Sequence, residues 1–315
     1  MDYTFNTMTY DLAIIGGGPA GVAAGVYAAR KRLRTIFITG DFQGQSAVSE
    51  GIENWVGSVK ISGLDLAKNL EAHLRAYATD IVDIKTGELC SGLTKNGELF
   101  SITTNKATYE AKTVLIATGS SRRKLDIPGA KEFEHKGITY CATCDAPMFG
   151  DMEVAVIGGG NAGLESAAQL LAYAKKVYIL HRHGEFKADP MIIEKVLKNP
   201  KTVSLLNTTP TAVIGDKFAT GLTYTDIISK EVKTIPVQGI FVEIGSVPAT
   251  AYAKGLVELD GVGHVVTNPA TQRTSVPGVW AAGDCTDGLY HQNNIAAGDG
   301  VKALEDIYNY LHRGK

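Results

Sequence analysis

Short apolar runs alternate along the chain with longer stretches in which apolar positions recur at helical spacing. Apolar runs bounded by glycine or polar residues predict buried strands, which we place at 10–16, 34–39, 112–118, 153–158, 175–181 and 277–282. Helical spacing is found near 19–31, 63–77, 161–173 and 294–311. Further strands, expected to be antiparallel, fall within 97–110 and 218–244. Alternation of strands with helices is typical of an α/β fold with a parallel sheet.

A glycine pattern follows two of the predicted strands. Glycines take the G-x-G-x-x-G spacing at Gly16, Gly18 and Gly21 and again, 142 residues downstream, at Gly158, Gly160 and Gly163. In dinucleotide-binding folds these glycines form a tight turn, admit a pyrophosphate against the backbone, and let a helix pack closely on the strand. One such turn also occurs without a ligand, but two copies predict two Rossmann-like domains and two dinucleotides.

The ends of the next strands distinguish the two copies. The first ends at Thr39–Gly40 without an acid, whereas the second ends in the basic run His181–His183, followed by Lys187. An acid here favours a free ribose 2′-hydroxyl and a base favours a 2′-phosphate, so the second site is predicted to prefer NADPH over NADH. The alternative is that the basic run is a solvated loop.

Two further strand ends point to ligand contacts. The run Val114–Gly119 closes on a small turn, and Gly278–Asp284 delivers an aspartate to the carboxyl end of an apolar strand. Open α/β sheets bind ligands at these ends. With two nucleotide motifs present, we predict that Asp284 contacts a flavin; the alternative is that it caps the following helix.

The pair Cys141 and Cys144 has the C-x-x-C spacing of redox motifs and of half a zinc site. Zinc would need two more close ligands, but the other two cysteines stand alone and no histidine follows Cys144 closely, so we expect no metal. The other alternative is a buried pair of cysteines without a redox role, against which the polar neighbours Thr143 and Asp145 argue.

Transfer of electrons from a flavin to a substrate disulfide needs one thiolate that reacts with the flavin, one that attacks the substrate, and an acid that returns a proton. Asp145 is the adjacent acid.

Composition restricts the class of protein. The chain has 315 residues, 44% hydrophobic and 20% charged, with a formal net charge of −2 and no dense basic block. These values fit a globular protein of two domains and argue against nucleic-acid binding.

The first basic residue is Arg30, and glycines with Pro19 interrupt the uncharged stretch 12–29, so we expect no secretory leader and no membrane span. Four cysteines, two of them isolated and expected to be buried, fit a cytoplasmic protein with one reactive dithiol.

In combination these motifs are specific for one family. Over nearly its whole length the chain resembles the bacterial-type, low-molecular-weight thioredoxin reductases, which are class II pyridine nucleotide-disulfide oxidoreductases. The resemblance rests on Gly16–Gly21, Ile38–Gly40, Gly44–Gln45, Glu53–Trp55, Ala117–Gly119, Cys141–Asp145, Gly158–Asn161, Gln272–Gly278 and Ala282–Asp284. Phe186–Asp189 and Gly239–Gly245 also resemble the reductase component of alkyl hydroperoxide reductase.

The resemblance implies a homodimer that carries electrons from NADPH through FAD to thioredoxin or a thioredoxin-like protein. An FAD-binding domain would comprise 1–120 and 246–315, and an inserted NAD(P)H-binding domain with the redox pair would comprise 121–245. Cys144 would face the flavin, Cys141 would attack the partner disulfide, and Asp145 would exchange protons. The domains would rotate about hinges near 120–125 and 245–248.

The cofactor-binding residues assigned in this way form two groups. For FAD they are Gly16, Gly18, Pro19, Ala20, Gly21, Thr39, Gly40, Gly44, Gln45, Asn54, Ala117, Thr118, Gly119, Gly283, Asp284, His291, Gln292 and Asn293. For the nicotinamide nucleotide they are Gly158, Gly160, Asn161, Ala162, Gly163, His181, Arg182, His183 and Lys187.

Several positions depart from the family pattern. His183 and Lys187 stand where the family usually has arginines, and His291–Asn294 replaces a segment that usually begins Arg-Gln-Ala. Pro147 follows the redox pair and removes a backbone donor. These departures leave NADH or reduced ferredoxin as alternative electron donors. The resemblance to the alkyl hydroperoxide reductase component leaves a peroxiredoxin system as an alternative partner, through a separate carrier protein. A redox-sensing module without turnover is an alternative of a different class, against which the intact set of Cys141, Cys144 and Asp145 argues.

Overall fold

The structure, a computed structural model, describes residues 9–49 and 51–312, which fall into two compact units. The first unit comprises Met1–Ser121 and Val247–Lys315, and the second comprises Arg122–Ser246. The expected domain boundaries lie one residue from these junctions. The expectation about a secretory leader concerns a segment that includes residues 1–8, which lie outside the described residues.

In the described part of the chain, the first unit is built on a seven-stranded sheet. Strands β3, β2, β1, β6 and β17 run parallel in this order, and β6 also pairs antiparallel with β5, which continues to β4. The chain passes from β1 through β2 to β3 and returns to β6 beside β1, so the strand order reverses between β1 and β6. The strands are β1 (Tyr10–Ile15), β2 (Thr35–Thr39), β3 (Val82–Thr86), β4 (Cys90–Asn96), β5 (Leu99–Thr104), β6 (Thr108–Ile116) and β17 (Val279–Ala281).

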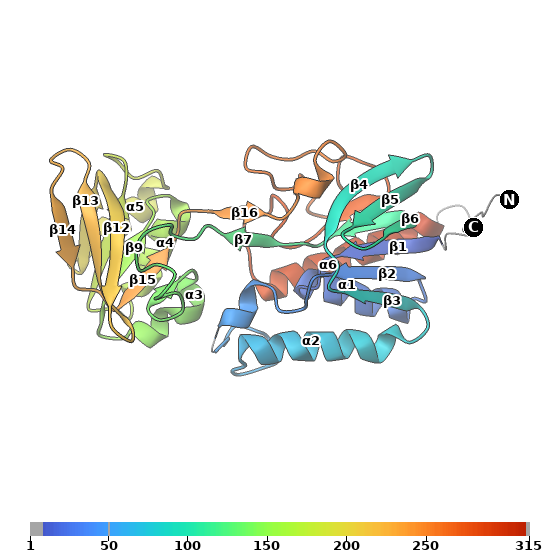
Figure 1. The fold of residues 1–315 in the computed structure, drawn as a ribbon, viewed down its shortest axis with the longest axis horizontal. Helices are drawn as coiled ribbons and strands as arrows, with labels where there is room; N and C mark the ends of the chain where they lie inside the picture. The colour runs from blue at the N-terminus through green and yellow to red at the C-terminus, as the bar shows by residue number, and fades with distance from the viewer. Residues whose placement is uncertain (1–8, 50, 313–315) are drawn as a thin grey trace. The chain divides into compact units, whose positions relative to one another are not determined.

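Helices cover one face of this sheet (Figure 1). They are α1 (Pro19–Arg30), α2 (Gly63–Ala78) and α6 (Asn293–His312). Leu12 and Ile14 of β1 lie in a core with these helices, whereas the alternate residues Ala13 and Ile15 lie in a second core with β4 and β5. A Cβ on Gly300 of α6 would lie 2.1 Å from the carbonyl oxygen of Ala20, so α6 packs directly on the first turn of α1.

The second unit has the same layered plan. Its parallel sheet has the order β11-β10-β9-β15-β8, and a separate antiparallel sheet has the order β12-β13-β14. The elements are β8 (Ile138–Thr139), α3 (Ala142–Asp145), β9 (Glu153–Ile157), α4 (Asn161–Leu170), β10 (Lys176–His181), α5 (Pro190–Leu197), β11 (Thr202–Leu206), β12 (Thr208–Gly215), β13 (Ala219–Asp226), β14 (Val232–Ile235) and β15 (Gly239–Val242). Helices α4 and α5 pack on one face of the parallel sheet and the antiparallel sheet packs on the other.

One strand differs from the sequence expectation. Antiparallel strands were expected within 218–244, and β13 and β14 are antiparallel, but β15 in the same range pairs parallel with β9 and β8. All four residues of β15 are buried. A strand covered on both faces is typical of a parallel sheet, and this burial is the physical reason for the difference.

Two chain segments connect the units. β7 (Ser120–Arg122) leads into the second unit and β16 (Ser246–Pro248) leads out of it, and the two strands pair with each other. The backbone N–H of Arg123 also donates to the carbonyl oxygen of Gly245 at 3.0 Å. The connectors are therefore held together by backbone hydrogen bonds rather than running separately.

The predicted fold class, two Rossmann-like domains with one inserted into the other, is confirmed by the two parallel sheets, by their helical layers and by the interrupted first unit. Each parallel sheet contains one strand that leads through a glycine turn into a helix: β1 into α1 and β9 into α4. Within residues 9–49 and 51–312, no helix combines the length and the apolar character that crossing a bilayer requires.

A turn at 260–264 in the first unit is held by the carboxylate of Asp260. It accepts hydrogen bonds of 2.7–2.8 Å from the backbone N–H groups of Val262, Gly263 and His264. The Nδ1 atom of His264 lies 3.0 Å from its other oxygen. Burial by itself would raise the pKa of Asp260, but these hydrogen bonds outweigh burial and lower the pKa to about 2.

We expect Asp260→Asn to lower the free energy of unfolding of the first unit by about 1 kcal/mol at neutral pH, because a partly exposed carboxylate loses its charge-assisted bonds. The carboxyl pKa is lower in the folded state than in the unfolded state, where it is about 3.9. The stabilisation is therefore complete above about pH 5 and disappears as the pH falls toward the folded pKa. Urea unfolding followed by tryptophan fluorescence measures this unit, which contains both Trp55 and Trp280. A deficit that does not shrink on acidification would contradict the assignment.

Candidate functional site

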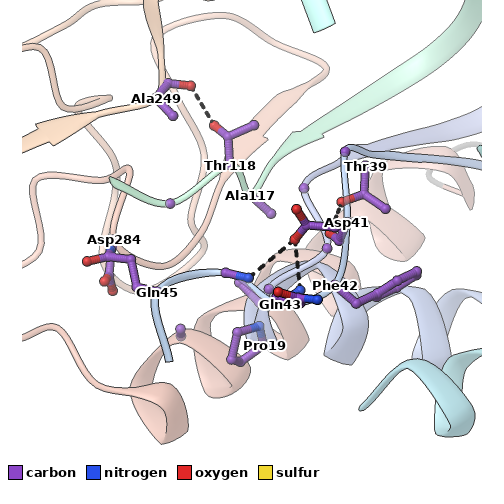
Figure 2. Close-up of a pocket in the computed structure, with 18 of the residues that line it drawn as sticks. Pro19, Thr39, Asp41, Phe42, Gln43, Gln45, Ala117, Thr118, Ala249 and Asp284 are labelled. Carbon is purple, nitrogen blue, oxygen red and sulfur yellow. Dashed lines mark hydrogen bonds between the residues drawn. The ribbon is translucent and has the colours of Figure 1, made fainter. Parts of the chain in front are cut away.

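A cavity of about 370 Å³ opens at the carboxyl ends of the parallel strands in the first unit (Figure 2). Its walls come from the turns after β1, β2 and β6, the start of β4, the segment after β16, and the residues after β17. Open α/β sheets bind ligands at this edge, where the strand order reverses. The position and size of the cavity are typical of a nucleotide-type site.

The first glycine turn forms the floor of this cavity. Gly16 has a φ of +120°, and a Cβ there would lie 2.1 Å from the carbonyl oxygen of Ala117, so the turn and the end of β6 touch through backbone alone. A Cβ on Gly18 would meet no atom within 4 Å. Pro19 starts α1 directly after this open point, and the first turn of α1 carries no acid. Free N–H groups and positive potential at such a helix end favour an anion such as a pyrophosphate.

Most of the residues predicted to bind FAD line the cavity. These are Gly16, Gly18, Pro19, Ala20, Thr39, Gly40, Gly44, Gln45, Ala117, Thr118, Gly119, Asp284 and Asn293. Residues outside the lining are Gly21, Asn54, Gly283, His291 and Gln292. Gly21 supports the turn, since a Cβ there would lie 1.9 Å from the carbonyl oxygen of Gly16, and Asn54 donates a hydrogen bond of 2.9 Å to Gln292.

Asp284 lies at the cavity wall formed after β17 (Figure 2). The following helix, α6, begins only at Asn293. Asp284 therefore does not stand at the start of that helix, which was the alternative to ligand contact. Asn293 itself accepts a hydrogen bond of 2.8 Å from the hydroxyl of Ser46, and both residues line the cavity, so two distant segments are joined there.

Several lining residues were not predicted from the sequence. Asp41 follows β2 at the cavity wall, and its Oδ1 accepts a hydrogen bond of 2.8 Å from the backbone N–H of Gln43 (Figure 2). Asp41 stands 20 residues after Gly21, the spacing at which this fold places a ribose-binding acid, so the signal was available. Tyr252, whose hydroxyl lies 3.3 Å from that of Thr118, comes from the segment after β16 and follows no motif.

The second glycine turn repeats the geometry of the first. Gly158 has a φ of +134°, and a Cβ there would lie 2.1 Å from the carbonyl oxygen of Glu243, while a Cβ on Gly163 would lie 2.1 Å from that of Gly158. A Cβ on Gly160 would meet nothing closer than the carbonyl oxygen of Lys187, at 3.8 Å. The turn is therefore closed toward the sheet and open at its middle glycine, as a site for a pyrophosphate requires.

The remaining nucleotide candidates lie around this second turn. The backbone N–H of Lys187 donates to the carbonyl oxygen of Gly159 at 2.8 Å, and Asn161 Oδ1 accepts from the N–H of Asp189 at 2.8 Å. These bonds hold the loop after β10 against the start of α4, where Ala162 is exposed. The structure thus brings the basic loop and the glycine turn together. A bound dinucleotide needs this arrangement, because its pyrophosphate lies at the glycine turn and its ribose at the end of the next strand, here β10.

The basic residues of this loop have different environments. His181 packs inward, with its ring 5.8 Å from that of Phe186 and its Nε2 buried without a hydrogen-bond partner in the described structure. Burial, and then the charges of His183, Arg182 and Lys187, lower the pKa of His181. Arg182 and Lys187 are exposed, and Arg182 Nε donates to His183 Nε2 at 3.1 Å. The free positive charge therefore lies on Arg182 and Lys187 rather than on His181.

Cys141 and Cys144 form a disulfide at the start of α3. Both residues are half-buried, and the backbone N–H of Cys144 donates to Cys141 Sγ at 3.2 Å. The hydroxyl of Thr139 donates a short hydrogen bond to the Asp145 carboxylate. The three predicted catalytic residues therefore lie on one turn of chain, with the acid held by the end of β8.

The other two cysteines differ in exposure. Cys285 is fully buried, as expected, but Cys90 is half-buried and lines the cavity of the first unit, which corrects the expectation that it is a core residue. Burial raises the pKa of each thiol to about 11. Thiols with such pKa values carry little thiolate at neutral pH and are poor nucleophiles. Burial therefore disfavours thiol chemistry at Cys90 and Cys285.

Two Rossmann-like units, a nucleotide-type cavity in one of them, and a glycine turn with a C-x-x-C disulfide in the other define the class of two-nucleotide disulfide oxidoreductases. The chain belongs to the pyridine nucleotide-disulphide oxidoreductase family, whose family model matches residues 10–300.

Known proteins similar to the chain carry several names. It is 37% identical over 305 residues to "NADH dehydrogenase" of Bacillus subtilis strain 168, which covers 96% of the chain and 59% of that protein. It is 38% identical over 308 residues to the F component of alkyl hydroperoxide reductase from Escherichia coli K12, which covers 97% of the chain and 59% of that protein. The chain thus spans about three fifths of the length of these curated relatives.

Solved structures match over nearly the full length of both chains. Thioredoxin reductase from Streptococcus pyogenes MGAS5005 has a TM-score of 0.88 at 32% identity, covering 98% of this chain and 100% of that one. Thioredoxin reductase from Giardia duodenalis also has a TM-score of 0.88 at 32% identity, with coverage of 96% and 99%. The resemblance to thioredoxin reductases therefore extends to the fold of both units.

Proposed function

We propose that the protein is a flavin-dependent disulfide reductase that passes electrons from a reduced nicotinamide nucleotide through FAD to Cys141 and Cys144. The final acceptor is the disulfide of thioredoxin or a thioredoxin-like protein. The observation that carries the proposal is that the Cys141–Cys144 disulfide and the second glycine turn lie in the same unit. The other unit has its own nucleotide-type cavity. Such an electron path needs a hydride donor, a flavin and a dithiol, and the chain offers a place for each.

The residues of the first unit fit FAD. Gly18 leaves open space beside the N-terminus of α1, where a pyrophosphate would be held by backbone N–H groups. Asp41 lies 20 residues after Gly21, at the spacing from which an acid would bind a ribose hydroxyl. When bound, FAD supplies two-electron exchange between a hydride donor and a disulfide.

The thiols perform the exchange with the partner. In net terms, NAD(P)H and one proton reduce one partner disulfide to two thiols and leave NAD(P)⁺. After reduction of the pair, Cys141 attacks the partner disulfide and one partner thiolate leaves; Cys144 then attacks Cys141 Sγ, reforms the internal disulfide and releases the second thiol. The N–H of Cys144, 3.2 Å from Cys141 Sγ, favours the thiolate of the attacking residue. Asp145, held by Thr139, would return the proton.

An anaerobic titration tests this proposal directly. The FAD-loaded protein is titrated with NADPH, NADH and reduced ferredoxin in turn, while flavin absorbance is followed with thioredoxin and a thiol reagent present. Loss of absorbance together with thiol production is expected with a nicotinamide nucleotide. A flavin that stays oxidised with every donor would reject the proposal, and reduction by ferredoxin alone would support that alternative.

We propose NADPH as the donor because the exposed cations Arg182 and Lys187 lie next to the second glycine turn. The name of the Bacillus subtilis relative supports NADH as the alternative. We expect Arg182→Gln to lower the ratio of kcat/KM for NADPH to that for NADH about tenfold, because a charge-assisted contact with the 2′-phosphate is lost.

The matched control is Lys176→Gln, which removes a cation at the opposite end of β10. Its NADPH-to-NADH ratio should stay within about twofold of that of the wild type. Equal ratios for the two variants would instead support the view that the basic run is a solvated loop.

The partner is proposed from the comparisons. The match to thioredoxin reductases spans both chains, whereas the match to the F component of alkyl hydroperoxide reductase spans 59% of that protein. We therefore propose a thioredoxin-like partner. Thiol production with thioredoxin is the expected result, and activity seen only with a carrier protein and its peroxiredoxin would support the peroxiredoxin alternative. The proposed homodimer is tested by light scattering.

A further inference from the structure

The second unit contains a buried carboxylate, that of Glu243, outside the residues assigned above. Its side chain is 4% exposed and follows β15, at the point where the strand order reverses between β9 and β15. The hydroxyl of Ser166 in α4 donates to one oxygen at 2.6 Å, and the guanidinium of Arg122 lies 3.4 Å from the other. A buried charge is costly unless it is paired in this way.

Glu243 also touches the second glycine turn through its backbone. Its N–H donates to the carbonyl oxygen of Ile157 at 2.8 Å, and its own carbonyl oxygen would lie 2.1 Å from a Cβ on Gly158. Ser166 belongs to the helix that begins at Asn161, directly after this turn. One residue therefore contacts the strand, the turn and the helix of the second nucleotide motif.

Arg122 brings the connector to the same residue. It is the last residue of β7 and the first residue of the second unit. The Arg122–Glu243 pair thus links the entry connector to the nucleotide turn entirely within the second unit. Both the nucleotide turn and the disulfide belong to this unit, which β7 and β16 connect to the unit with the first glycine turn.

The charges of Arg122 and Glu243 influence the electrostatic potential at the second glycine turn. A Cβ on Gly158 would lie 3.4 Å from the Cβ of Glu243, so the Glu243 side chain starts next to the turn that would receive an anionic pyrophosphate. The guanidinium of Arg122, 3.4 Å from the Glu243 carboxylate, offsets its negative charge. Burial raises the pKa of Glu243, while the Ser166 hydrogen bond and the Arg122 charge oppose the effect of burial and Glu165 adds to it. Without Arg122, the turn would face an uncompensated buried negative charge, or the carboxyl would take up a proton and reorganise its contacts.

We propose that Glu243 is a positioning residue that couples the connector to the nucleotide turn through Arg122, so that a change on the connector alters the affinity of the turn for a nicotinamide nucleotide. The inference rests on the proposed function for the identity of the ligand. Its signature is non-additivity: the effect of losing Arg122 requires the carboxylate of Glu243.

Calorimetry of NADP⁺ and NAD⁺ binding to the FAD-loaded protein tests the coupling. We expect Arg122→Met to weaken binding about fivefold or more, Glu243→Gln to change it less than about twofold, and the double variant to match Glu243→Gln alone. Lys124→Met is the matched control, because it removes the nearby Lys124–Glu134 ion pair of 2.8 Å without touching the turn. Arg122→Gln, which keeps a hydrogen-bond donor without the charge, gives the same test should Arg122→Met not fold.

An effect of Arg122→Met no larger than that of Lys124→Met, or single effects that add in the double variant, would overturn the coupling. Wild-type protein that binds neither NADP⁺ nor NAD⁺ would instead refute the nucleotide assignment of the proposed function. The two failures are therefore distinguishable.

Discussion

Replacement of Cys144 by serine is expected to lower the rate of disulfide reduction by a factor on the order of 10³ or more, since the pair acts as a unit. Reduction of bound flavin by the nicotinamide nucleotide should continue, because that step uses the glycine turns and not the thiols. The variant can no longer reform the Cys141–Cys144 bond that the structure contains. Steady-state thiol production and stopped-flow flavin absorbance measure the two steps separately.

The same variant tests the roles within the pair. Cys144→Ser should accumulate a mixed disulfide between Cys141 and the partner, because the thiol that resolves it is missing. Cys141→Ser should not. Mass spectrometry after exposure to oxidised thioredoxin detects the adduct, and accumulation in the opposite variant would exchange the two roles. Cys285→Ala is the control: it removes a fully buried thiol and should leave turnover within about twofold of the wild type.

The second large effect is expected at the middle glycines of the two turns. Gly18 has a φ of −76° and Gly160 a φ of −91°, so alanine is compatible with the backbone at both positions. A Cβ would meet no atom within 4 Å at Gly18 and only an oxygen at 3.8 Å at Gly160. The added methyl group would therefore not collide with the protein, so a loss of binding in either variant reports a ligand held at that glycine.

We expect Gly18→Ala to weaken FAD binding about tenfold or more, an effect of about 1.4 kcal/mol or above, with the thermal stability of the apoprotein unchanged. Gly160→Ala should leave flavin content unchanged and weaken nicotinamide-nucleotide binding by a similar factor. Flavin content from absorbance and nucleotide binding by calorimetry measure the two effects. If Gly18→Ala weakened only nicotinamide-nucleotide binding and Gly160→Ala only FAD binding, each ligand would bind to the other unit. If neither variant changed binding, the two glycine turns would not be the nucleotide sites.

Gly16→Ala provides the contrast. A Cβ there would lie 2.1 Å from the backbone of Ala117 at a φ of +120°, so the variant should lose stability even without a ligand. The comparison of Gly16 with Gly18 therefore separates a glycine required by the protein backbone from a glycine required by the ligand. A Gly16→Ala apoprotein as stable as the wild type would contradict this distinction.

The local motifs were predictable because each has its own short-range cause. The glycine spacing, the strand before it and the small-residue helix after it are adjacent in the sequence, and the structure shows them as β1 with α1 and β9 with α4. Asp41 was also within reach, because its distance from Gly21 is fixed by the length of one helix and one strand. The parallel pairing of β15 was not predicted, because a short apolar run does not show which strand it will pair with.

The sequence by itself determined the class of fold, the positions of the two glycine turns and the redox pair, since these depend on residues close together along the chain. Only the tertiary structure decided which distant residues complete each site. Tyr252 reaches the cavity of the first unit from the segment after β16, and Glu243, after β15, joins Ser166 of α4 to Arg122 of β7, because segments far apart in the sequence meet in the folded chain. Such contacts depend on the order of the strands in a sheet and on burial, which no short stretch of the sequence determines.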